Sequence, residues 1–128
     1  MSRHDARDIA FKLIFSYTFD NEKNLEALEE YTLSSDGDDK AYINEVYNGV
    51  IEHYDELMED IKNSAEKFEV SRIFKTDLAI IMLALYEIKY IESIPYKVSV
   101  DEAINFAHKY STDKSGKYIN GILSKFAR

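Results

Sequence analysis

Hydrophobic residues recur along this chain with the spacing of amphipathic α-helices. In the first segment they fall at i, i+4, i+7, i+8 and i+11: Ala6, Ala10, Leu13, Ile14 and Tyr17. Because residues three or four apart share one face of an α-helix, this spacing predicts a helix with one buried face. Ser2 followed by Asp5 has the pattern of a capping box, which predicts that the helix starts there. Asp8 and Lys12 favour an i,i+4 ion pair on it.

The same spacing predicts three more helices before residue 70. A short one is indicated by Leu25, Leu28 and Leu33, and the polar run 34–40 is predicted to be a loop. The next carries Ile43, Val46, Tyr47, Val50, Ile51 and Tyr54. The one after carries Leu57, Met58, Ile61, Ala65 and Phe68. Gly49 lacks a side chain, so it favours a close approach by another helix at that point.

Residues 78–86, LAIIMLALY, are apolar at every position. A helix with no polar face is buried on all sides, so this segment is predicted to be the centre of a helical bundle. Ser99 with Glu102 has a second capping-box pattern and predicts the start of the next helix, after Pro95. Its inner face would carry Val100, Ala103, Ile104 and Ala107. A polar connection over 111–115 leads to a last helix with Ile119, Ile122, Leu123 and Phe126 facing inward.

These segments predict one all-α domain over residues 1–128, a compact bundle of about seven helices. The chain has four glycines and one proline, which is too little turn punctuation for an all-β protein. Its 128 residues are enough for a single hydrophobic core. It has no cysteine, which excludes disulfides and cysteine-ligated metal sites. The longest apolar run is far shorter than a membrane span and no signal peptide is evident, so a soluble cytoplasmic protein is predicted.

The sequence does not match the catalytic and metal-binding motifs that we compared it with. The three histidines are widely separated, and no HExxH pattern occurs. Residues 115–117 read SGK, but the positions that a phosphate-binding loop requires around them are not matched. The acidic run 36–47 lacks the central glycine and closing glutamate of a calcium loop. We therefore expect no enzyme, no cofactor and no metal, while a carboxylate pair assembled from distant segments stays open as an alternative.

Positive charge is concentrated toward the end of an acidic chain. Residues 1–60 carry 5 Lys and Arg against 16 Asp and Glu, whereas residues 61–128 carry 11 against 8. One stripe of the last helix, beside its buried face, holds Lys114, Lys117, Tyr118, Gly121 and Lys125. Lysines neutralise phosphates, and an aromatic ring among them can stack on an unpaired base. The alternative without a binding role is that the lysines only keep this face of the helix soluble and Tyr118 lies at the edge of the core.

Two features of the first helix bear on the same question. Arg3 and Arg7 lie four residues apart on one face, and arginine binds phosphate through a two-pronged contact. Phe11, Phe15 and Phe19 form a second apolar row. Such a row either packs against a neighbouring helix, which we favour, or forms a partner surface.

Three stretches together resemble the NusB family of bacterial transcription antitermination factors. They are ARDIAFKLIFSY, LAIIMLALYEI and IPYKVSVDEAINFAHKYSTDKSGKYINGIL. The last is the most specific, because its IP-x-x-V-x-x-x-EA entry, TDKS connector and K-[FY]-[VI]-NG-[IV]-L helix occur together. The resemblance implies two small helical bundles packed together. It also implies binding of single-stranded boxA RNA from ribosomal RNA operon transcripts, jointly with the ribosomal protein NusE, so that RNA polymerase reads through terminators.

The resemblance also implies roles for individual residues. Its RNA-binding positions, together with the lysine stripe, fall on Arg3, His4, Arg7, Lys114, Ser115, Lys117 and Tyr118. Its NusE-facing positions fall on Phe15 and Asp77. We therefore expect the arginines of the first helix to converge in space with the lysines of the last helix and hold an RNA strand beside Tyr118.

Four residues depart from the family pattern. Asp5 and Asp8 lie among the arginines of the first helix, so the protein alone should attract RNA weakly and depend on NusE. Met82 replaces a common arginine, and Ser111 replaces a common glycine. Three alternatives accompany the resemblance: a homodimer formed through the first helix, a protein-interaction module without RNA contact, and the NusB-like part of a ribosomal RNA methyltransferase. The chain is too short for a methyl-donor-binding domain and lacks a cysteine nucleophile, so it cannot be that enzyme by itself.

Overall fold

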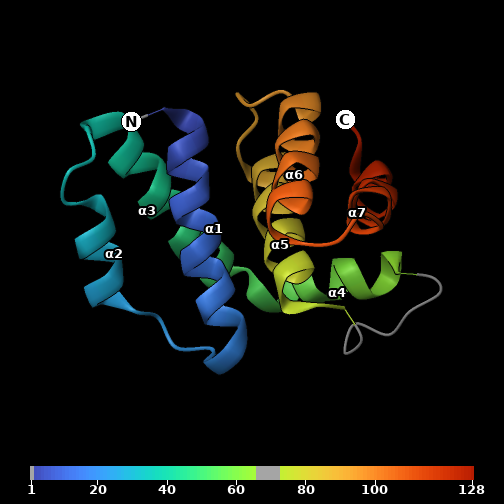
Figure 1. Ribbon diagram of the computed structural model, residues 1–128, viewed down its shortest axis with the longest axis horizontal. Helices are drawn as coiled ribbons and strands as arrows, with labels where there is room; N and C mark the ends of the chain where they lie inside the picture. The colour runs from blue at the N-terminus through green and yellow to red at the C-terminus, as the bar shows by residue number, and fades with distance from the viewer. Residues whose placement is uncertain (1, 66–72) are drawn as a thin grey trace.

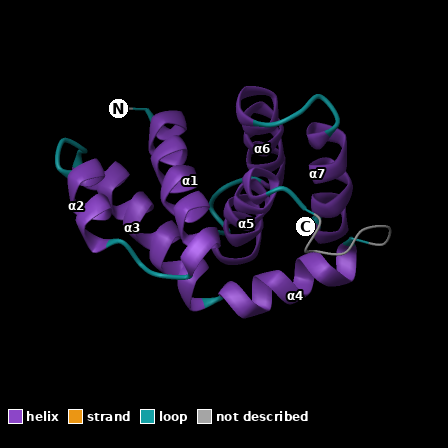
Figure 2. Cartoon of the chain, turned by 60° about the horizontal axis from the view of Figure 1, so that its bottom comes forward, coloured by secondary structure: helices purple, strands orange, loops and turns teal. Residues whose placement is uncertain are grey.

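The computed structural model describes residues 2–65 and 73–128, and these form α-helices without any strand. The helices are α1 (Arg3–Asp20), α2 (Leu25–Thr32), α3 (Gly37–Glu52), α4 (Tyr54–Ser64), α5 (Lys75–Tyr90), α6 (Tyr96–Tyr110) and α7 (Ser115–Leu123), with a 3-10 turn at Ser124–Phe126. Figure 1 shows α1, α2 and α3 on one side and α5, α6 and α7 on the other. In Figure 2, α4 crosses below α5. The predicted all-α class with two packed sub-bundles is confirmed.

Helix α1 begins as its sequence predicts. The Ser2 side chain accepts a hydrogen bond from the Asp5 amide, and the Asp5 carboxylate accepts one from the Ser2 amide, so the capping box is present. The hydrogen bond from the Ser2 backbone lowers the pKa of Asp5. One turn later, Lys12 Nζ lies 2.9 Å from Asp8 Oδ2, as expected. The helix ends at Asn21, which adopts the left-handed conformation at φ 56°.

Helix α5 is the centre of the molecule, as its apolar sequence predicts. Every residue from Asp77 to Ile88 is buried, and α1, α3, α4, α6 and α7 all pack against the helix. Met82 is completely buried, so the residue that departs from the family pattern lies in the apolar core. At Gly49 of α3, an added Cβ would lie 2.2 Å from the Tyr86 ring, which confirms the expected close approach of two helices.

Three predicted details of the fold are wrong. Asp36 caps α3, so residues 37–40 are helical and the loop is shorter than predicted. Helix α6 begins at Tyr96, directly after Pro95, and Ser99 is a buried residue inside it rather than its cap. Tyr54, which its spacing placed in the third helix, instead begins α4, because α3 ends at Glu52. The predicted short second helix is confirmed as α2, with Leu25 and Leu33 exposed at 58% and 86%. The predicted core residue Phe68 lies outside the described residues.

The basic residues at the end of the chain bind the carbonyl ends of other helices. Lys125 Nζ donates to the Ser64 carbonyl at the end of α4, at 2.9 Å. The Arg128 side chain donates to the carbonyls of Ile88, Ile91, Glu92 and Ile94 around the end of α5. Carbonyl groups at helix C-termini lack intrahelical partners and carry partial negative charge, so cations stabilise them. Lys125 is exposed, but its ammonium group is therefore engaged by the end of α4.

Candidate nucleic-acid interface

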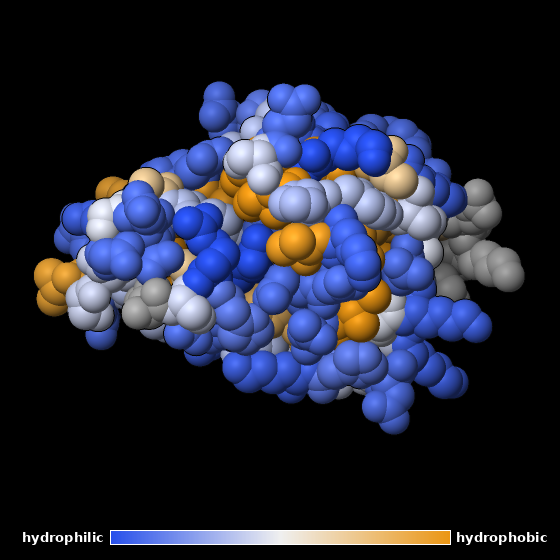
Figure 3. Space-filling model, turned by 90° about the horizontal axis from the view of Figure 1, so that it is seen from above, coloured by the Kyte–Doolittle hydropathy of each residue, from blue (hydrophilic) through white to orange (hydrophobic). Residues whose placement is uncertain are grey.

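The start of α1 presents two cationic or titratable side chains to solvent. The Arg3 guanidinium lies 4.4 Å above the centre of the Tyr42 ring, and its Nε is 4.0 Å from Asp39. His4 Nδ1 lies 2.8 Å from Glu102 on α6, and the imidazole stacks on Phe106. Arg3 and His4 both remain exposed. The face seen in Figure 3, from above the view of Figure 1, is mainly hydrophilic with separate hydrophobic patches.

Arg7 has a different placement from its neighbours. It is 5% exposed, and its Nε and Nη2 donate to Glu87 of α5 at 2.9 and 3.3 Å. Glu87 also accepts hydrogen bonds from the hydroxyls of Tyr42 and Ser99. All four side chains are buried, and they join α1, α3, α5 and α6. The predicted phosphate contact of Arg7 does not fit this placement, because its guanidinium is enclosed and already bound to a carboxylate.

The buried network keeps its charge by mutual compensation. Burial alone would lower the pKa of Arg7, but the hydrogen bond and charge of Glu87 outweigh burial and raise it. Burial, reinforced by Glu87, raises the pKa of the Tyr42 hydroxyl far above its ordinary value, so it stays a hydrogen-bond donor. Removing one member would leave the others buried without partners, which is costly in the protein interior.

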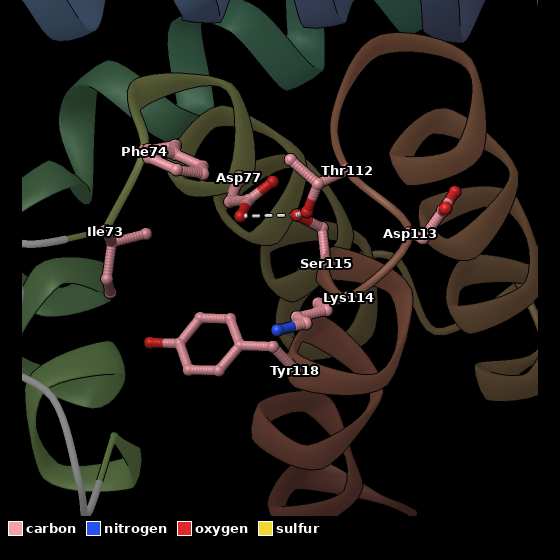
Figure 4. A pocket seen from close by; sticks show the side chains of 8 residues that line it. All are labelled: Ile73, Phe74, Asp77, Thr112, Asp113, Lys114, Ser115 and Tyr118. Atoms are coloured by element: carbon pink, nitrogen blue, oxygen red, sulfur yellow. Dashed lines mark hydrogen bonds between the residues drawn. The ribbon is translucent and has the colours of Figure 1, made fainter.

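A pocket lies at the other end of α1, where α5 and α7 begin. Its volume is about 570 Å³, and it is lined by Ile73, Phe74, Asp77, Thr112, Asp113, Lys114, Ser115 and Tyr118. Figure 4 shows these side chains and the bond between Ser115 and Asp77. Ser115 and Ser111 donate to the Asp77 carboxylate at 2.9 and 2.5 Å, so Ser111 serves here as an anchor for α7. Asp77 and Ser115 are buried, and their polar atoms therefore fix the start of α7 rather than face a ligand.

Tyr118 and two lysines are the accessible members of this end. The Tyr118 ring projects from α7 into the pocket and is half-buried. Burial, followed by the charge of Asp77, raises the pKa of Tyr118. Lys114 and Lys117 are exposed, and within residues 2–65 and 73–128 neither has an ion-pair partner. Free cations beside a partly exposed ring are suited to a phosphate chain that carries unpaired bases.

The two areas do not converge as expected. Lys75, two residues before Asp77, donates to the carbonyl of Thr18 near the end of α1. Arg3 is the first residue of that helix. At 1.5 Å per residue, Arg3 and Thr18 are about 22 Å apart along the helix axis. Arg3 and the start of α5 therefore lie toward opposite ends of α1, and the bond between Ser115 and Asp77 places the start of α7 beside the start of α5.

Sequence patterns miss the partners that decide which cation is accessible. The residues near Arg7 in the sequence do not predict that Glu87, Tyr42 and Ser99 surround its guanidinium, because these three residues lie 80, 35 and 92 positions away. One signal was present: a single glutamate directly follows the nine-residue apolar run of α5. A carboxylate in a helix that is buried on every side requires a buried donor.

Comparison with known proteins settles the family. The sequence model of the NusB family matches residues 4–128. This chain belongs to the NusB family. The transcription antitermination protein NusB of Agathobacter rectalis is 39% identical over 99% of this chain and 100% of its own length. The protein of the same name from Clostridium novyi is 34% identical over 100% of this chain and 99% of its own length.

Solved structures of NusB proteins have the same fold. The structure of T. maritima NusB has a TM-score of 0.90 at 32% identity and covers 99% of this chain and 91% of its own. A crystal structure of the antitermination factors NusB and NusE in complex with double-stranded RNA matches with a TM-score of 0.84, covering 98% of this chain and 97% of the other. At 21% identity, that second match shows the fold alone.

Two further features of the described residues bear on function. No helix in this part of the chain is long and apolar enough to cross a membrane. No cluster of three or more histidine and carboxylate side chains within residues 2–65 and 73–128 is arranged to hold a metal ion.

Proposed function

We propose that this chain is a transcription antitermination factor that binds single-stranded boxA-type RNA of ribosomal RNA operons together with NusE, so that RNA polymerase reads through terminators. Its relatives carry the name transcription antitermination protein, and a protein of the same fold has been solved with NusE and RNA. The observation that carries the proposal is the set of accessible cations and one aromatic ring at the start of α7, where Lys114 and Tyr118 line one pocket and the exposed Lys117 directly precedes Tyr118.

The residues have two kinds of role in this proposal. Arg3, His4, Lys114 and Lys117 contact RNA phosphates, and Tyr118 stacks on an unpaired base. Phe15, which is partly exposed on α1, contacts NusE. Arg7, Asp77 and Ser115 are positioning residues, because their polar groups are buried and bound within the protein. Asp77 supports the NusE surface by fixing the start of α7 beside the exposed Phe74.

The separation of the two areas sets the length of RNA. The path from Arg3 to the end of α6 is at least about 12 Å long, the axial length between Glu102, which pairs with His4, and Tyr110. At about 3.4 Å per stacked nucleotide, a strand that continues beyond Tyr110 to Lys114 requires more than about four nucleotides. A strand of three nucleotides reaches one area only. Single-stranded RNA is preferred, because stacking on Tyr118 requires a base that is not paired within a duplex.

The acidic character of the chain predicts dependence on the partner. At a net charge of −8, the protein alone attracts a polyanion weakly, and a basic partner supplies the missing positive potential. A gel-shift titration of a 12-nucleotide boxA RNA, with and without NusE, tests the proposal. We expect strong binding only with NusE, and weaker binding of the matching RNA duplex. Tyr118→Ala should weaken binding by about 1–3 kcal/mol, the usual contribution of one stacked base. The absence of any RNA complex in the presence of NusE would contradict the proposal.

A further inference from the structure

We propose that the seam between α1 and α6 is the RNA track that joins the two areas, and that Lys12 and Lys109 contact phosphates along it. The proposal rests on the RNA binding proposed above and assigns to it two residues that no sequence pattern indicated. Such a track would allow one RNA strand to contact both Arg3 and Lys114.

Helices α1 and α6 run side by side in the same direction (Figure 1). His4 of α1 pairs with Glu102 of α6, and one turn later Asp8 meets Lys109 and Tyr110. The seam therefore starts beside Arg3. It ends where α6 ends, at Tyr110, four residues before Lys114. A strand laid along the seam would pass from the arginine end to the lysine end without leaving the surface.

The charges of the seam are arranged in layers. Asp8 forms an ion pair with one lysine of each helix. On α1, Lys12 Nζ lies 2.9 Å from Asp8 Oδ2, and on α6, Lys109 Nζ lies 3.7 Å from Asp8 Oδ1. The Asp8 side chain is 15% exposed, whereas those of Lys12 and Lys109 are 47% and 55% exposed. The carboxylate lies beneath and the ammonium groups face solvent, so an approaching phosphate meets the cations first. Asp8 therefore organises the basic surface, although in the sequence it looked only like a repulsive charge.

Aromatic rings lie between the two helices under these cations. The Phe11 ring stacks on Tyr110 at 5.0 Å and on Phe106 at 5.7 Å between centres, and Phe15 continues the row. Phe11 and Phe106 are buried, while Tyr110 and Phe15 are partly exposed. Lys109 Nζ lies 4.9 Å from the centre of the Tyr110 ring. Ammonium groups interleaved with accessible rings are what single-stranded nucleic acid requires from a binding surface.

The acidic groups of the seam are already engaged. Asp8 holds the two lysines, and Glu102 is paired with His4. Burial alone would raise the pKa of Asp8, but hydrogen bonds from Tyr110 and Lys12 outweigh it and keep the carboxylate ionised. The hydrogen bond with Asp8 raises the pKa of Lys12, so this lysine stays charged. Since two ammonium groups surround the single carboxylate of Asp8, this part of the seam carries net positive charge and attracts a phosphate chain.

The test compares two double variants that change the net charge equally. The seam variant is Lys12→Gln with Lys109→Gln. The matched control is Lys62→Gln with Lys97→Gln, which removes two exposed lysines elsewhere, one of them also in an i,i+4 pair with an aspartate. Binding of a 12-nucleotide boxA RNA to the complex of each variant with NusE is measured by fluorescence anisotropy over a series of salt concentrations.

We expect the seam variant to bind roughly 20-fold more weakly at 0.1 M salt, with a log–log salt slope shallower by about 1.4, since each phosphate contact to a single strand contributes about 0.7. The control should bind like the wild-type protein. Equal slopes for the two variants would overturn the seam proposal while leaving the proposed function intact. A second result would also overturn it: a seam variant with an unchanged salt slope of RNA binding but weaker binding to NusE in the absence of RNA. That result would show that the seam binds the protein partner rather than RNA. Failure of the wild-type complex to bind RNA would overturn both proposals.

Discussion

Arg7 and Lys117 were predicted to have the same role, yet their surroundings are opposite. Arg7 is enclosed by Glu87, Tyr42 and Ser99, and its guanidinium is paired with the buried carboxylate of Glu87. Lys117 extends from α7 into solvent with no ion-pair partner among the described residues. A cation that is already paired in a buried site cannot also neutralise a phosphate without breaking that site.

The difference shows how this acidic protein divides its positive charge. Arg7 joins the two sub-bundles through the core, and Lys125 and Arg128 close the ends of α4 and α5. These cations are committed to the fold. Arg3, Lys114 and Lys117 stay accessible, and together with His4 and the seam lysines Lys12 and Lys109 they form the proposed RNA surface. Mutations in the two sets should therefore affect different measurements, stability for the first and RNA binding for the second.

The largest effect is expected from Glu87→Ala. It leaves the buried guanidinium of Arg7 and two hydroxyls without their partner, and breaking a buried ion pair in this way costs about 3–5 kcal/mol of unfolding free energy. Urea denaturation measures the loss. The control Glu56→Ala breaks an exposed contact with Lys89 and should cost less than about 1 kcal/mol. A loss of similar size in the two variants would show that the buried network does not stabilise the fold as described.

A smaller effect separates the two roles directly. Arg7→Lys removes one of the two contacts with Glu87 and should lower the unfolding free energy by about 1–3 kcal/mol. Because Arg7 is a positioning residue, the salt slope of RNA binding to the complex with NusE should not change. Lys117→Gln should do the reverse: unchanged stability, and a slope shallower by about 0.7. If Arg7→Lys also reduced the slope, Arg7 would be a phosphate contact after all.

The smallest effect concerns pH and the exposed ion pairs of the seam. The pKa of Asp8 is lower in the folded protein than in the unfolded chain. Its ion pairs therefore stabilise the protein above the unfolded-state value of about 4 and lose this effect as the pH falls through the folded-state pKa. The stability difference between wild type and Asp8→Asn should be below about 1 kcal/mol at pH 7 and should shrink as the pH falls through the folded-state pKa of Asp8. A difference that grows as the pH falls would contradict the low pKa of Asp8.

The fold followed from the sequence wherever one segment carried the whole signal. The apolar run of α5, the capping box at Ser2 and the close approach at Gly49 each depend on residues within one or two turns, and all three predictions are confirmed. The start of α6 was misplaced because Ser99 and Glu102 have the spacing of a cap, whereas Pro95 begins the helix one turn earlier and Ser99 bonds to Glu87.

The candidate site could be predicted only in part, because accessibility depends on residues far away in the sequence. Lys114, Lys117 and Tyr118 were found from their spacing on one helix. The enclosure of Arg7 by three other helices and the pairing of Lys109 with Asp8 leave no trace in local sequence. The distance between Arg3 and α7 likewise depends on how α1 and α5 pack, which periodicity does not reveal.

The central claim is that RNA lies on accessible cations along one path, from the start of α1 over the seam to the start of α7. Backbone amide NMR of the labelled protein bound to NusE, before and after addition of the 12-nucleotide RNA, tests it most directly. We predict RNA-dependent shifts at residues 3–5, 8–12, 109–110 and 114–118, with none in α2. Shifts confined to α2 and α3, or absent from the last helix, would contradict the account.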